Sequence, residues 1–136
     1  MVNPAFPGRP GLTPTSLRLV RYAMLAGVLL FGAIAYYQGA QRAPEDAVEN
    51  LEAIGWVGYG MCALTMVVVA VLRQVRERAS EAARPTLSMI GSALAEGTAM
   101  FGAVIMVLGG GIGVYALGLV LFLSTWTLLP ADAGTA

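Results

Sequence analysis

The sequence predicts an all-α integral membrane protein with four transmembrane helices in an antiparallel bundle. Of its 136 residues, 57% are hydrophobic and only 12% are charged, a composition typical of membrane proteins. Four apolar stretches approach the roughly 20 residues that a helix needs to cross a bilayer. The arginines gather in alternate connections between these stretches, which is the distribution expected of a chain that crosses a membrane several times.

Polar, glycine or proline residues separate the four expected membrane helices. We place these helices at 18–39, 54–73, 86–108 and 112–130. Pro85 suits the first turn of the third helix, where its fixed φ is favourable and no amide proton is needed. Three consecutive glycines at 109–111 end the third helix, and Pro130 ends the fourth.

The remaining segments are expected outside the membrane. Residues 1–17 contain four prolines and two glycines, so we expect a tail that is either mobile or laid on another subunit. Residues 131–136 form a second, short tail. Residues 73–82 are expected to continue the second helix into water, with Arg73 and Glu77 paired across one turn.

The orientation in the membrane follows from the arginines, which are the only basic residues. Three lie in the N-terminal segment and four in the connection 73–85, against one in the connection 40–53. The positive-inside rule then places the N-terminus, the 73–85 connection and the C-terminus in the cytoplasm, with the bacterial inner membrane as the expected location. Tyr22 and Trp126 are expected near the cytoplasmic interface.

The residue types that are missing exclude several classes of function. The chain has no His, no Lys and a single Cys, so it offers no zinc, haem or iron–sulfur ligand set and no catalytic triad. We therefore expect no metal, no cofactor and no enzymatic activity. The net charge of zero also indicates that nucleic acid is not a partner. Cys62 is expected to be a small buried hydrophobic residue.

The first and third helices share a short pattern at a spacing of 70 residues. In this register Gly27, Phe31, Gly32 and Ala33 superpose on Gly97, Phe101, Gly102 and Ala103. The pattern suggests that the two helices are copies, and chance similarity between two stretches rich in Gly and Ala is the alternative.

Glu96 is the only acidic or basic residue within the four predicted apolar cores. It lies near the middle of the third helix, where an acid costs about 3 kcal/mol on insertion scales. We therefore expect it to face protein or water, and we expect any function to depend on it. On the same helix Gly91, Ala95 and Ala99 form a stripe of small residues that lets another helix approach closely.

The run 89–104, which contains Ile90-Gly91-Ser92-Ala93-Leu94-Ala95-Glu96, resembles the carboxylate helix of the ring-forming c subunit of rotary ATP synthases. The glycine-rich segment 55–60 is similar to the first helix of that family, and Arg73-Gln74 to its polar turn. The resemblance covers about residues 54–108. Because the carboxylate lies on the third of four helices, and the 73–85 turn is long, the chain resembles a four-helix relative more than a standard ring subunit.

This resemblance implies a proton-translocating membrane subunit in which Glu96 is the ion-binding residue. Ser92 and Thr65 would then support Glu96 through hydrogen bonds, and Gly91 and Gly97 would set close helix contacts. The expected partners are lipid and other membrane subunits, in a homo- or hetero-oligomer. The alternative is a structural or accessory subunit of a larger membrane complex, in which Glu96 is a buried acid satisfied by Ser92, Thr65 or a carbonyl.

Overall fold

Four α-helices and one short 3₁₀ helix make up the part of the chain that this computed structural model describes, residues 13–46 and 48–131. The helices in chain order are α1 (Pro14–Ala40), the 3₁₀ helix η1 (Pro44–Asp46), α2 (Leu51–Arg78), α3 (Arg84–Val107) and α4 (Gly113–Leu128). The all-α prediction is confirmed, and each of the four predicted helices is present.

α1 begins four residues before the predicted span because its first turn is capped. The Thr13 hydroxyl accepts a hydrogen bond at 3.2 Å from a backbone N–H three residues later, and Pro14 occupies the first turn. Leu17 is completely buried, so the end of the predicted N-terminal tail belongs to the bundle. Residues 1–12 of that tail, and 132–136 of the predicted C-terminal tail, lie outside the described residues.

α1, α2 and α3 are each long and apolar enough to cross a membrane. α2 extends to Arg78, and Arg73 Nε lies 3.8 Å from the Glu77 carboxylate, as the sequence predicts. α4 is shorter than predicted, with 16 residues, or about 24 Å at a rise of about 1.5 Å per residue. It ends before Pro130 because a proline disfavours helical backbone at the preceding residue.

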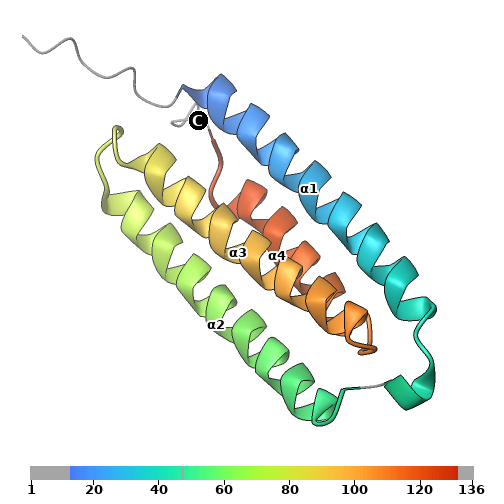
Figure 1. Ribbon diagram of the computed structural model, residues 1–136. Helices are drawn as coiled ribbons and strands as arrows, with labels where there is room; N and C mark the ends of the chain where they lie inside the picture. The colour runs from blue at the N-terminus through green and yellow to red at the C-terminus, as the bar shows by residue number, and fades with distance from the viewer. Residues whose placement is uncertain (1–12, 47, 132–136) are drawn as a thin grey trace, which may run out of the picture.

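α3 is the central helix of the bundle. It packs against α1, α2 and α4, and Figure 1 shows α1 and α2 on opposite sides of it, with α4 behind. Consecutive helices run in opposite directions. The start of α1, the connection between α2 and α3, and the end of α4 therefore lie at one end of the bundle, which we call the terminal end.

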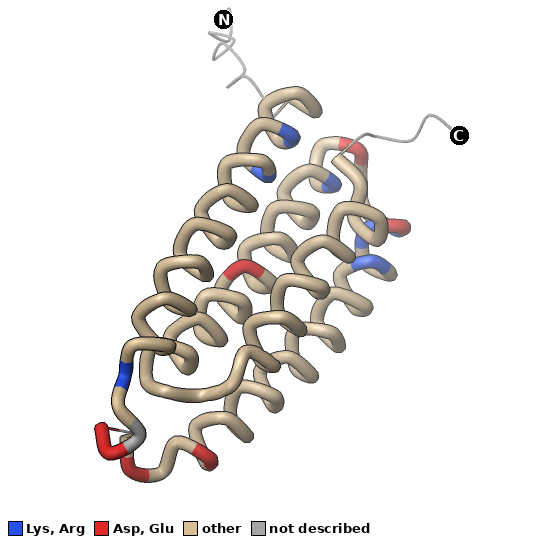
Figure 2. The backbone as a smooth tube through the Cα atoms, turned by 90° about the vertical axis from the view of Figure 1, so that its right-hand side faces the viewer, with Lys and Arg blue, Asp and Glu red and all other residues tan. Residues whose placement is uncertain are grey.

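Charged residues gather at the two ends of the bundle (Figure 2). The described arginines of the terminal end are Arg18, Arg21, Arg73, Arg76, Arg78 and Arg84. The opposite end holds Arg42 and the acidic residues Glu45, Asp46, Glu49 and Glu52. One acidic position lies midway along the bundle, apart from both groups, and it belongs to α3.

α3 and α4 approach each other so closely that two positions have room only for glycine. A Cβ atom at Gly118 would lie 2.6 Å from the Cα of Ala99, and one at Gly102 would collide with the backbone of Tyr115. Since backbone atoms cannot move aside as a flexible side chain does, both glycines are required for this contact.

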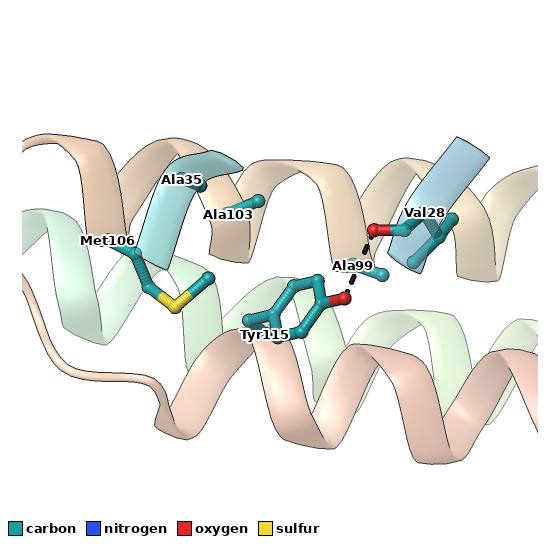
Figure 3. Close-up of a cluster of buried hydrophobic side chains, with 6 residues drawn as sticks. All are labelled: Val28, Ala35, Ala99, Ala103, Met106 and Tyr115. Atoms are coloured by element: carbon teal, nitrogen blue, oxygen red, sulfur yellow. Dashed lines mark hydrogen bonds between the residues drawn. The ribbon is translucent and has the colours of Figure 1, made fainter. Parts of the chain in front are cut away.

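Tyr115 extends the α3–α4 contact to α1. Its hydroxyl donates a hydrogen bond to the Val28 carbonyl at 3.0 Å, and a Cβ at Gly32 would collide with its ring. Figure 3 shows this bond at the centre of a buried cluster contributed by α1, α3 and α4. Gly32 and Gly102 occupy equivalent positions in the pattern that repeats at a spacing of 70 residues, and both lie against this tyrosine. That the pattern arose by duplication stays a prediction.

We expect Gly102→Ala to destabilise the bundle, by about 1–3 kcal/mol, because the added methyl group has no space beside Tyr115. Gly97→Ala is the matched control on the same helix, since a Cβ there meets nothing within 4 Å. It should be neutral, or stabilising by about 0.5–1 kcal/mol, because alanine favours the helix. Thermal unfolding of both variants in detergent measures the difference. Equal unfolding temperatures would contradict the close contact.

Candidate functional site

Glu96 lies in the middle of α3, at the edge of the buried face of that helix. Ala99 and Ala103, three and seven residues further on, are fully buried in the cluster that joins α3 to α1 and α4. Gly97, the next residue in the chain, is exposed. Glu96 is half-buried between these two surfaces, and among the described residues its carboxylate has neither a hydrogen bond nor an ion pair.

Ser92 and Thr65, the two hydroxyls expected to support Glu96, bind other residues. Ser92 Oγ lies 3.2 Å from Thr125 Oγ1 of α4, and Thr65 Oγ1 lies 2.7 Å from Thr98 Oγ1. Both pairs are buried and connect α3 to a neighbouring helix, so they stabilise the bundle. The Ser92 hydroxyl is bonded to α4 and the Thr65 hydroxyl to Thr98 of α3, so neither supports Glu96 in the described structure.

Three of the four small residues expected to allow close packing lie in tight contacts. Ala95 and Ala99 are completely buried, and a Cβ at Gly91 would collide with the Leu129 side chain of the segment after α4. Gly97 differs, because it has open space where its side chain would be. Among the described residues Gly97 makes no close helix contact, and it instead contributes to an open face of α3.

An apolar groove of about 560 Å³ runs over this open face, between α1 and α2. Phe31 of α1 and Leu64 and Val68 of α2 line its sides, and Gly97 and Phe101 lie along its floor. The groove is almost wholly apolar, so it suits an acyl chain or another helix better than a column of water. Glu96 does not line the groove, although Gly97, the next residue in the chain, does.

Two arginines of the terminal end bind backbone carbonyls beyond the last turn of α4. Arg21 is 3% exposed, and its guanidinium donates to the carbonyls of Leu129 and Ser88. Arg76 donates to the Pro130 carbonyl at 2.9 Å. Carbonyls at a helix C-terminus lack partners within the helix and attract cations, so these bonds stabilise the end of α4.

Arg42 has the same role at the opposite end, where its guanidinium donates to the Val107 carbonyl of α3 at 2.9 Å. From the sequence, Arg21 and Arg42 are predicted only to contribute positive charge, and these structural roles are not predicted. For Arg21 a signal was available, because the helix start signal at Thr13 and Pro14 places that arginine two turns inside α1.

The described residues offer no candidate metal site. They contain no group of three or more His, Cys, Asp or Glu side chains that could hold a metal ion. Cys62 is buried, as predicted. Comparison with protein families, curated proteins and solved structures finds no significant match to the chain. Function is therefore inferred from Glu96 and its surroundings.

Because Ser92 and Thr65 are bonded to other hydroxyls, their removal is expected to leave the reactivity of Glu96 towards carbodiimide almost unchanged. Ser92→Ala and Thr65→Val should each leave the rate of carbodiimide modification of Glu96 within about twofold of the original, because neither hydroxyl contacts the carboxylate. The rate is measured by mass spectrometry of the peptide that contains Glu96. A change of tenfold or more in both variants would show that the hydroxyls serve Glu96 after all.

Proposed function

We propose that this chain is a proton-translocating subunit of a larger membrane assembly, similar to the ring-forming c subunit, and that Glu96 carries the proton. The position of Glu96 is the observation that carries the proposal. Its carboxylate is half-buried at the middle of α3 and has no partner among the described residues. A carboxyl group that only supported the fold would be expected to have its hydrogen bonds satisfied within the core.

The physical basis is the change in surroundings that such a carboxyl experiences. In an apolar medium a carboxyl group keeps its proton, and it loses that proton where water or a cation is supplied. No described arginine lies near the middle of the bundle, because the described arginines lie at its two ends. The cation that releases the proton would therefore come from another subunit.

The membrane placement belongs to the same proposal. α1, α2 and α3 have the length and composition to cross a bilayer. We place α4 alongside them as the fourth crossing, with local thinning of the bilayer offsetting its shorter length. The terminal end, with six described arginines, would face the cytoplasm, and the end with Glu45, Asp46, Glu49 and Glu52 would face outward.

The second candidate is an accessory subunit that stabilises a larger complex without transporting ions. One observation favours it: the groove on the open face of α3, next to Glu96, is lined almost wholly by apolar side chains. In that case a neighbouring subunit would seat against α3 and supply a permanent hydrogen bond to Glu96.

Modification by dicyclohexylcarbodiimide separates the two candidates. In the assembled complex we expect selective labelling of Glu96 that falls as the pH rises, because the reagent requires a protonated carboxyl group in apolar surroundings. Glu96→Gln should abolish proton flux into vesicles, measured with a pH-sensitive dye under an imposed potential. Glu52→Gln, which removes an exposed acid near the start of α2, is the matched control and should leave flux unchanged.

Intact assembly together with unchanged flux in Glu96→Gln would reject proton transport and leave the accessory role. Labelling of exposed acids such as Glu52 and Glu81 to the same extent as Glu96 would likewise show that Glu96 has no special reactivity.

Single-cysteine labelling tests the proposed orientation. In a Cys62→Ala chain, Glu49→Cys lies in the connection before α2 and Ser80→Cys in the connection before α3, and both original residues are exposed. A membrane-impermeant maleimide should modify Glu49→Cys in intact spheroplasts and Ser80→Cys only after lysis. The reverse pattern would invert the topology, and labelling of both sites without lysis would contradict the membrane placement.

A further inference from the structure

A second site lies at the terminal end of the bundle, where positive charge meets aromatic side chains. A pocket of about 250 Å³ opens there between the first turns of α1 and the end of α4. The residues that line it are Arg18, Arg21, Tyr22, Trp126, Pro130 and Ala131. The pocket is far from the middle of α3 and takes no part in the role proposed for Glu96.

Two N–H donors of this lining are buried and have no acceptor within the described structure. Arg21 is 3% exposed, and its Nη2 donates to the Leu129 carbonyl, yet its Nε has no partner. Trp126 Nε1 is also buried without a partner. Buried donors are nearly always satisfied in native proteins, so these two leave unmet hydrogen-bonding capacity beside the pocket.

The other features of the pocket favour an anion at a membrane surface. Arg18 adds a second positive charge to the lining, and no described acid contributes to it. The rings of Tyr22 and Trp126 meet edge to face, with centroids 5.0 Å apart. Such amphipathic rings concentrate at the level of the lipid headgroups, where a phosphate group would lie within reach of the guanidinium groups.

We propose that this pocket binds the phosphate group of an anionic phospholipid. The proposal rests on the membrane placement given above, because the lipid would come from the cytoplasmic leaflet that faces the terminal end. Arg21 is held in position by its bonds to Leu129 and Ser88, so the site is formed before the lipid arrives. A guanidinium group can donate two parallel hydrogen bonds to the oxygens of one phosphate group, and basic pockets near the cytoplasmic surface bind anionic headgroups.

Quenching by brominated lipids tests this proposal. In a Trp56→Phe chain Trp126 is the only tryptophan, so its fluorescence reports on lipid at the pocket. The full chain is placed in phosphatidylcholine vesicles to which brominated phosphatidylglycerol or brominated phosphatidylcholine is added. We expect the phosphatidylglycerol to reach half-maximal quenching at a mole fraction several-fold lower than that of the phosphatidylcholine.

Two arginine variants test whether the preference for phosphatidylglycerol arises at this pocket. Arg18→Gln, at an exposed position of the lining, should reduce the preference for phosphatidylglycerol about fivefold, which is roughly the contribution of one basic residue near a headgroup. Arg78→Gln removes the same charge from an exposed position of the terminal end outside the pocket. It should leave the preference unchanged.

Equal quenching by the two brominated lipids would overturn the proposal, and so would an equal loss of preference in Arg78→Gln. Recovery of fluorescence on addition of millimolar inorganic phosphate would assign the pocket to the free anion rather than to a lipid. Absence of quenching by either lipid would show that the chain does not enter the bilayer. Absence of quenching would therefore refute the membrane placement, whereas equal quenching by the two lipids would refute only the phosphate-binding pocket.

Discussion

The close approach of α3 and α4 is the constraint on which the rest of the bundle depends. Gly118 and Gly102 bring the two backbones into direct contact, and this contact carries the Tyr115 ring across α3 to the Val28 carbonyl of α1. A bulkier residue at either glycine would move Tyr115 away from α1 as well as from α3. The position of α1 is therefore set by two glycines that belong to other helices.

The same packing explains why Glu96 is not enclosed. α3 contacts α1, α2 and α4 on three sides, and α1 and α2 lie too far apart to cover the fourth, where the groove opens. Glu96 lies between the α1 contact and this open face, while the hydroxyls of Ser92 and Thr65 are used to connect helices. Among the described residues the Glu96 carboxyl thus has no hydrogen-bonding partner, and both candidate functions start from this observation.

The sequence predicted the all-α class and the four helices, with Glu96 midway along the third, because composition and the length of apolar stretches determine these. It did not predict how each helix is rotated. That rotation depends on packing between helices, so Ser92 pairs with Thr125 and not with Glu96, and Gly97 faces open space. α1 starts four residues earlier than predicted because Thr13 caps it and Pro14 suits its first turn, and the burial of Arg21 again depends on packing between helices.

The hydrogen bond from Arg21 to the Leu129 carbonyl joins residues 108 positions apart in the chain. A ribosome delivers Arg21 with the first helix and its acceptor only with the last. Until then the guanidinium needs water or another polar group as a temporary partner, because a buried charge without hydrogen bonds is unstable. The segment after α4 therefore helps to hold the first turns of α1, and a chain truncated before Leu129 would lack this bond.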